Sequence, residues 1–136
     1  MTAAPQLLQV CPLSTNDELI EARQAVKLHA ADMKFSPVNQ TKLITVTSEL
    51  GRNAMLHGLG GTLCIDLVSS GSKVGMRLTF QDAGPGIEDI ELALTDGYTT
   101  KNGLGLGLSG SKRLMDDFTI KSEVQVGTTV CVIKWK

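Results

Sequence analysis

The sequence has few cysteines, few aromatic residues and no excess of charge of either sign. Of its 136 residues three are cysteines and 4% are aromatic, and the formal net charge is −1 at pH 7. Because nucleic-acid binding requires a basic surface, DNA or RNA is not expected as the main partner. The chain also lacks a run of roughly 18 apolar residues that could span a membrane, and its start lacks a signal peptide. We therefore expect a soluble, cytoplasmic protein that does not bind a membrane.

Residue patterns typical of several common sites are missing as well. Cys11, Cys64 and Cys131 lie far apart without a CxxC pair, which predicts reduced cysteines in the core or in strands. Neither His29 nor His57 has a cysteine or a second histidine at metal-ligand spacing, so packing or surface roles are expected for both. Without a GxSxG turn or a Cys/His pair, the sequence gives no support for hydrolysis through a covalent intermediate.

The rest of the composition is that of a globular protein. Hydrophobic residues make up 42% of the chain and charged residues 20%, which argues against disorder. A chain of this length can bury a core but is too short for two comfortable domains. We therefore predict a single domain over residues 1–136.

The order of the expected elements predicts the fold class. Hydrophobic periodicity and turn residues indicate helices and strands in alternating blocks. In chain order these are a strand over Gln6–Leu13, a helix from the cap residues 14–17 to about 34, a helix over 36–57, a hairpin of strands around 63–67 and 74–80, a short helix over 87–94, a polar loop over 96–102 that could move as a lid, a helix over 108–115, and a closing hairpin of 118–124 and 128–135. The prediction is an α/β (α+β) two-layer sandwich, with a mixed, mostly antiparallel sheet covered on one face by helices.

Two polar residues of the second predicted helix lie beside its apolar stripe. Glu49 and Asn53 are four positions apart, and this spacing places them along one flank of the stripe formed by Leu43, Val46, Leu50 and Ala54. Mg²⁺ takes few oxygen ligands from protein, so the Asn53 amide oxygen could suffice, and Glu49 could polarise an attacking hydroxyl. On this pair alone, a solvated helix face is the more probable interpretation.

A turn rich in small residues follows the predicted core strand, with the sequence Asp82-Ala83-Gly84-Pro85-Gly86-Ile87. Asp82 could accept a hydrogen bond from an exocyclic amine such as that of adenine, and the glycines Gly84 and Gly86 would let the base lie against the backbone. An ordinary strand-ending turn is about equally probable, because these residue types all favour turns.

A glycine-rich run precedes the last predicted helix. Gly103, Gly105 and Gly107 alternate with Leu104, Leu106 and Leu108, so backbone amides and a helix N-terminus could face phosphates. The run is no Walker A loop, and a flexible hinge is nearly as probable. Lys101, just before it, could neutralise a terminal phosphate, although a surface lysine is the commoner case.

Read together and in order, the motifs resemble the four boxes of the superfamily of gyrase, heat-shock chaperone, histidine kinase and mismatch-repair ATPases, known as GHKL. The four segments are Glu49-Leu-Gly-Arg-Asn53, Asp82-Ala-Gly-Pro-Gly86, Gly103-Leu-Gly-Leu-Gly107-Leu-Ser109 and Gly127-Thr128-Thr129. Within the superfamily the chain looks most like the small bacterial serine/threonine kinases of the anti-sigma and RsbT group. The segments 48–53, 96–100 and 112–118 carry that likeness.

The resemblance implies a Bergerat-fold ATP site. It implies Mg²⁺ on Asn53, Glu49 as the catalytic carboxylate, and Asp82 on the adenine amine. Gly84 and Gly86 would line the base together with Ile87, the run from Gly103 to Leu108 would wrap the phosphates, and Thr128 would reach the adenine through water.

The implied activity is that of a serine/threonine kinase and partner-switching regulator. Its substrate would be a STAS-domain antagonist or stressosome protein, and a downstream phosphatase, cyclase or sigma factor could be the switched partner. A binding module in which nucleotide acts mainly as a conformational ligand is the alternative. A simple ATPase without a protein substrate is a third and weaker possibility.

Overall fold

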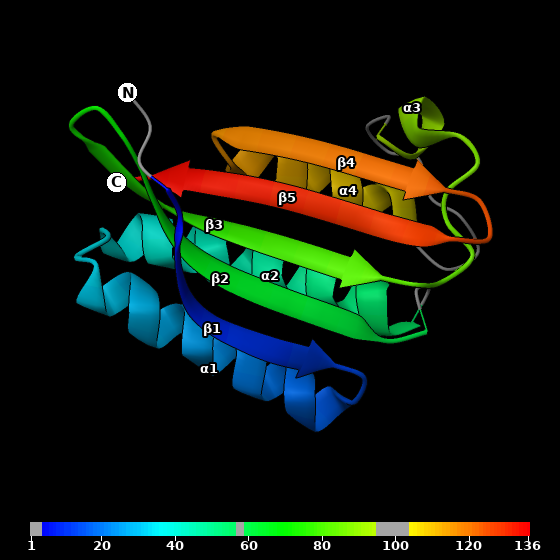
Figure 1. Ribbon diagram of the computed structural model, residues 1–136, viewed down its shortest axis with the longest axis horizontal. Helices are drawn as coiled ribbons and strands as arrows, with labels where there is room; N and C mark the ends of the chain where they lie inside the picture. Colours follow the sequence, from blue (N-terminus) through cyan, green and yellow to red (C-terminus); the bar gives the residue numbers. More distant parts are fainter. Residues whose placement is uncertain (1–3, 57–58, 95–103) are drawn as a thin grey trace.

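The computed structural model describes residues 4–56, 59–94 and 104–136. Five strands form one sheet in the order β1-β2-β3-β5-β4, and each neighbouring pair is antiparallel (Figure 1). The strands are β1 (Gln6–Leu13), β2 (Gly61–Ser70), β3 (Lys73–Asp82), β4 (Asp117–Glu123) and β5 (Gly127–Trp135). The prediction of a mostly antiparallel sheet is thus confirmed, and its "mixed" part is wrong for the described strands.

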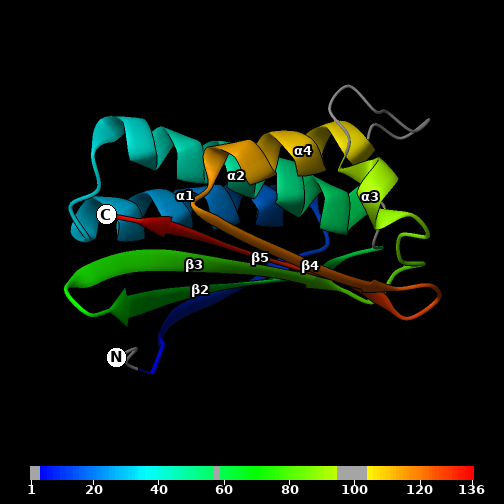
Figure 2. The same ribbon diagram turned by 90° about the horizontal axis from the view of Figure 1, so that it is seen from above.

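Helices cover one face of this sheet and leave the other open. They are α1 (Asn16–Asp32), α2 (Pro37–Leu56), α3 (Ile90–Ala93) and α4 (Leu104–Leu114). Figure 2 shows α1, α2 and α4 in a layer on one side of the strands, with α3 near one end. The predicted two-layer sandwich is confirmed. Among the described residues, no helix is long and apolar enough to cross a membrane.

Local sequence explains where the two long helices begin. The Thr15 side chain accepts a hydrogen bond from the Glu18 amide at 3.1 Å, and the Glu18 carboxylate accepts one from the Ser14 amide at 2.8 Å. This reciprocal arrangement satisfies donors that a helix start leaves unpaired. Before α2, the Ser36 hydroxyl accepts from the Asn39 amide at 3.2 Å, and Pro37 takes the first helical position.

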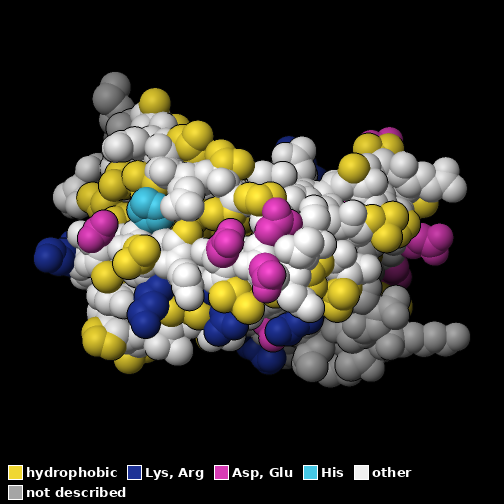
Figure 3. Space-filling model, turned by 90° about the horizontal axis from the view of Figure 1, so that it is seen from below, with side chains coloured by type: hydrophobic (Ala, Val, Ile, Leu, Met, Phe, Trp, Pro, Cys, Tyr) yellow, Lys and Arg dark blue, Asp and Glu magenta, His cyan; other side chains and the backbone are white. Residues whose placement is uncertain are grey.

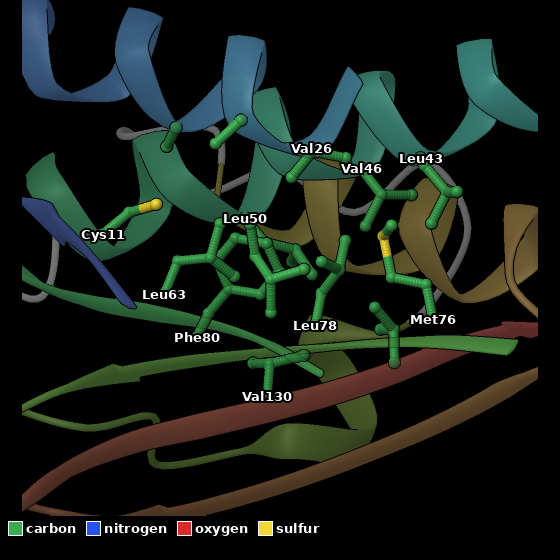
Figure 4. Packing of buried hydrophobic residues seen from close by; sticks show 14 of the residues in the cluster. Cys11, Val26, Leu43, Val46, Leu50, Leu63, Met76, Leu78, Phe80 and Val130 are labelled. Atoms are coloured by element: carbon green, nitrogen blue, oxygen red, sulfur yellow. The ribbon is translucent and has the colours of Figure 1, made fainter. Parts of the chain in front are cut away.

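The core lies between the helix-facing side of the sheet and the helices α1, α2 and α4, and α2 forms its centre. Leu63 of β2 stands opposite Phe80 of β3, and Ile65 stands opposite Leu78. Figure 4 shows Leu63, Leu78 and Phe80 pointing toward Leu43, Val46 and Leu50 of α2. These three residues and Ala54 form the stripe that the sequence predicted as buried, and each is at most 3% exposed. Burying each large apolar side chain stabilises the fold by roughly 1.5–3 kcal/mol. Asp82 has the same strand parity as Leu78 and Phe80, so it faces the helix layer where β3 ends.

Two helices, α3 and α4, have boundaries that differ from the sequence prediction. The short helix is confined to Ile90–Ala93, because the Asp89 carboxylate caps it by accepting the Leu92 amide hydrogen bond at 3.0 Å. The last helix begins at Leu104 rather than 108, so the glycine-rich run forms its first turn. Contact with α2 offsets the low helix propensity of these glycines. The described part of α2 ends at Leu56, and His57 and the predicted polar loop lie outside the described residues.

The three cysteines are free and lie in strands, as the sequence predicts. Cys11 of β1 is buried beneath the helices, and burial raises the pKa of its thiol because the thiolate would lose its hydration; Cys64 nearby adds to this shift. The Cys11 thiol therefore stays protonated and behaves as a small apolar side chain.

An ion pair between the almost buried Lys134 and the exposed Asp116 gives a test of the fold. Lys134 is 9% exposed, and its Nζ lies 3.1 Å from Asp116 Oδ1, while Asp116 Oδ2 accepts the Trp135 amide at 2.7 Å. We expect Asp116→Ala to lower the free energy of unfolding in urea by about 2 kcal/mol, because it leaves an almost buried ammonium unpaired. Asp117→Ala, the matched control, removes a bond to the Trp135 indole at 2.9 Å and should cost below about 1 kcal/mol. Equal losses for the two variants would contradict this account.

Candidate functional site

The Asp82 carboxylate ties the end of β3 to the start of β5. Its Oδ1 atom accepts hydrogen bonds from the Gly84 amide at 2.9 Å and from the Thr128 amide at 3.3 Å. Within the described part of the chain, Oδ2 accepts no hydrogen bond. Half of the carboxylate therefore fixes the turn, and the other half can accept a donor from a ligand.

The turn after Asp82 is held against the β4–β5 hairpin by its backbone. The Pro85 carbonyl accepts the Gln125 amide at 2.7 Å, and the Ile87 amide donates to the Ser122 hydroxyl at 2.7 Å. Gly86 has φ of +80°, and a Cβ there would collide with the Glu123 carbonyl. The missing side chain of Gly86 thus allows packing against the hairpin, and the role of Gly86 beside a base stays a prediction.

A hollow of about 410 Å³ adjoins this corner. Asp82, Ser122 and Thr128 line it together with Gln81, Ala83, Lys121, Glu123, Val126, Gly127 and Thr129. Its volume lies within the range of roughly 300–1,000 Å³ found for small-ligand sites. Gln81 has the opposite strand parity to Asp82, so the hollow extends around the end of the sheet toward its open face.

A second cluster lies between α2 and α4. A Cβ added to Gly107 of α4 would lie 3.2 Å from Asn53 Nδ2 and 3.2 Å from Glu49 Oε2, so the first turn of α4 rests on both side chains. The Asn53 Nδ2 atom is buried and has no hydrogen-bond partner in the described part of the chain. Such an orphaned donor is costly unless an acceptor reaches it, as a phosphate oxygen would.

Glu49 is the more accessible member of this cluster. Its side chain is 43% exposed, and Oε1 lies 3.7 Å from Arg52 Nη1, an exposed contact that contributes little. Glu49 also lines a hollow of about 230 Å³ between the helices, together with Thr45, Gly107, Gly110, Ser111, Arg113 and Leu114. An accessible carboxylate beside a cavity can take part in proton transfer.

The residues predicted to bind phosphates do not all lie in the same environment. Leu108 is 1% exposed, so its side chain belongs to the core. Leu104, Gly105 and Leu106 contribute the backbone of the first turn of α4, where amides lack partners within the helix. Lys101 and Gly103 lie outside the described residues.

The two clusters lie toward the same end of the molecule. Figures 1 and 2 place there the end of β3, the β4–β5 hairpin, α3, the start of α4 and the end of α2. The described residues include no group of three or more His, Cys, Asp or Glu side chains that could hold a metal ion. The Asn53 amide oxygen still fits Mg²⁺, because that ion keeps waters and phosphate oxygens as most of its ligands.

Ser122 also belongs to the Asp82 corner of the site, although the sequence did not predict it. Its hydroxyl accepts the Ile87 amide and lies 2.7 Å from the Thr128 hydroxyl. A signal was available, because Ser122 continues the inward-facing positions of Phe118 and Ile120 in β4. A hydroxyl at such a position near a strand end needs polar partners.

A further groove, of about 300 Å³, lies apart from both clusters. It is lined by Ile20, Arg23, Gln24 and Lys27 of α1 and by Ile44 of α2, and so by no predicted site residue. Figure 3 views the molecule from the side of α1 and β1 and shows charged side chains of both signs among hydrophobic ones.

Comparison with known proteins identifies the class. Residues 38–136 match the family of histidine kinase-, DNA gyrase B- and HSP90-like ATPases, and the chain belongs to this family. Among its relatives, serine/threonine-protein kinase RsbT of Bacillus subtilis is 39% identical over 123 residues, which cover 90% of this chain and 92% of RsbT. The anti-sigma F factor of Anoxybacillus flavithermus is 36% identical over 134 residues, covering 93% and 89%. The resemblance predicted from the four motifs is thus confirmed.

A solved structure supports the fold independently. The catalytic domain of histidine kinase ThkA superimposes with a TM-score of 0.54, covering 95% of this chain and 99% of that domain, at 19% identity. At this identity the likeness concerns the fold alone.

The contact of Gly107 with both polar side chains gives a prediction with a matched control. We expect Gly107→Ala to weaken Mg-ATP binding about tenfold, which corresponds to 1.4 kcal/mol, because the methyl group would displace Glu49 and Asn53. Gly110→Ala lies one turn further along α4, where an added Cβ meets no atom within 4 Å. It should bind nucleotide like the parent and gain up to about 1 kcal/mol from helix propensity.

Isothermal titration calorimetry and urea unfolding measure both quantities. Parent-like binding by both alanine variants would exclude the seam between α2 and α4 from the nucleotide site.

Proposed function

We propose that the chain is an ATP-dependent protein serine/threonine kinase that works as a partner-switching regulator. The observation that carries this proposal is that Gly107 lies against Glu49 and against Asn53 Nδ2, an atom with no hydrogen-bond partner among the described residues. A carboxylate, an orphaned donor and the amides of a helix start then converge at one point. Membership of an ATPase family and likeness to RsbT agree with this assignment.

In this proposal the Asp82 corner binds the adenine base. Asp82 Oδ2 accepts the exocyclic amine, since Oδ1 already holds the Gly84 and Thr128 amides. The backbone of Gly84, Gly86 and Ile87 lines the base, and the Thr128 hydroxyl reaches it through water. The hollow of about 410 Å³ adjoins Asp82 and Thr128, and its other part, lined by Gln81, Lys121 and Thr129, lies on the open face of the sheet.

The seam between α2 and α4 would then bind the phosphates. Asn53 would hold Mg²⁺ through its amide oxygen, and its Nδ2 would donate to a phosphate oxygen. Amides of the glycine-rich run Gly103–Leu108 would face the remaining oxygens, and Lys101 would neutralise the terminal phosphate. When bound, Mg²⁺ supplies charge neutralisation.

Glu49 would activate the acceptor. The oxygen of a serine or threonine side chain attacks the γ-phosphorus, the bond to the bridging oxygen breaks, and ADP leaves. Glu49 accepts the proton of the attacking hydroxyl, a role that fits its 43% exposed side chain. Positioning and charge neutralisation supply most of the acceleration in such transfers.

For the substrate we propose a STAS-domain antagonist protein, and for the switched partner a phosphatase, a cyclase or a sigma factor, all in the cytoplasm. The second candidate function is an anti-sigma factor or activator module that mainly holds a protein, with nucleotide as the conformational ligand. This second function stays a candidate because the chain is 36% identical to an anti-sigma F factor over 93% of its length. Nucleotide-dependent capture of a sigma factor would support the second function, and capture of a STAS protein the first.

Transfer of radiolabel from ATP to a co-encoded STAS-domain protein tests the kinase. We expect Glu49→Gln to lower the rate about a hundredfold or more while Mg-ATP still binds, because the amide cannot take the proton. Asn53→Ala should abolish transfer and weaken metal-dependent ATP binding.

Arg52→Ala is the control for these variants. Among the described residues it removes only the exposed contact with Glu49 at 3.7 Å, and it should change the rate less than about fivefold. If Glu49→Gln and Asn53→Ala both transfer phosphate at the parental rate, the assigned roles are wrong.

A further inference from the structure

Ser122 connects three segments that meet at the Asp82 corner. It lies in β4 directly opposite Thr128 of β5, with the two hydroxyl oxygens 2.7 Å apart. The Ile87 amide, from the turn after β3, donates to Ser122 Oγ at 2.7 Å. Ser122 Oγ also lies 3.3 Å from the Gly127 carbonyl, to which it donates. A single half-buried hydroxyl therefore makes three polar contacts.

The number of protons determines which way these bonds run. A serine hydroxyl has one proton and two lone pairs. If Ser122 gives its proton to the Gly127 carbonyl, the 2.7 Å contact needs the proton of Thr128, because two oxygens this close repel without one. This arrangement satisfies all three contacts of Ser122, whereas donation to Thr128 would leave the Gly127 carbonyl without this bond.

We propose that Ser122 is a positioning residue that turns the Thr128 proton away from the ligand and thereby makes the site selective for purines with a 6-amino group. Thr128 then presents lone pairs, and Asp82 presents Oδ2, since its Oδ1 already accepts two amides. A ligand edge, or a bridging water, that faces the lone pairs of Thr128 and Asp82 must donate hydrogen bonds to them. This inference rests on the proposed function, in which Asp82 faces the base.

Two triphosphates that differ only in the amine test the proposal. Purine riboside 5′-triphosphate is ATP without its 6-amino group. The dissociation constant of this analogue divided by that of ATP therefore measures recognition of the amino group. The parent should bind ATP more tightly. We expect Ser122→Ala to weaken ATP binding about tenfold, or 1.4 kcal/mol, and to change binding of the amine-free analogue less than about twofold.

Further variants separate positioning from general stabilisation. Ser122→Thr keeps the hydroxyl and should keep the parental ratio, and so should Thr119→Ala, which removes an exposed hydroxyl from the opposite face of β4. Thr128→Val removes the group that Ser122 orients and should lower the ratio similarly. The double variant Ser122→Ala/Thr128→Val should then be no worse than either single variant, because coupled residues are not additive. If Ser122→Ala does not fold, Ser122→Cys replaces it with the same expected fall.

The outcomes distinguish this inference from the proposed function. If the parent prefers ATP but Ser122→Ala keeps the parental ratio, or weakens the binding of both nucleotides by the same factor, the role proposed for Ser122 is wrong. The ATP site itself is not contradicted by that result. A parent that binds neither triphosphate overturns the proposed function and the role of Ser122 with it. A ratio that falls in Ser122→Ala and Thr128→Val, and is preserved in Ser122→Thr, supports the inference.

Discussion

The Asp82 carboxylate is the contact on which the candidate site depends. It joins the end of β3 to the start of β5, 46 positions further along the chain, through the Thr128 amide. The same oxygen holds the Gly84 amide, and the Pro85 carbonyl and Ile87 amide bind the hairpin at two more points. A carboxylate fixed by two amides needs no reorganisation before it meets a ligand, which is the condition for strong polar recognition.

In α4, which forms the opposite wall of the site, glycines lower the stability of the helix but allow its backbone to pack closely. Glycines in its first turn each cost up to about 1 kcal/mol of helix stability relative to alanine. At Gly107 the missing side chain lets the helix backbone reach Glu49 and Asn53, and no larger residue would fit there without moving them. The cost is offset by packing of Leu108 within the helix and of Met115 directly after it, since both side chains enter the core. One end of α4 therefore serves the site and the other stabilises the fold.

The sequence predicted most of the fold because period-2 and period-3.6 patterns are local. Alternation through Leu63–Leu67 and Met76–Phe80 and the stripe of α2 were enough to place Asp82 and Asn53. The start of α4 was missed because glycine propensity argues against a helix, and only contact with α2 overrides it. Ser122 was missed because its role depends on register: only the pairing of β4 with β5 brings its hydroxyl to Thr128. Motif order identified the family, but motifs do not contain residues that act through another side chain.

The split of the site between sheet and helix also explains how a kinase of this kind can act as a switch. Asp82 belongs to an edge fixed by backbone hydrogen bonds, whereas the turn proposed to face the phosphates belongs to α4 and lies against Asn53 of α2, whose Nδ2 atom has no hydrogen-bond partner in the described part of the chain. On the proposed function, a nucleotide that supplies an acceptor to Asn53 stabilises one position of α4 relative to others. A partner that binds one position of α4 more tightly than the others would then bind the nucleotide states with different affinities, and by linkage it would alter nucleotide affinity by the same factor. Loss of the terminal phosphate on transfer removes part of that stabilisation, so phosphorylation and release of a partner follow from the same contact.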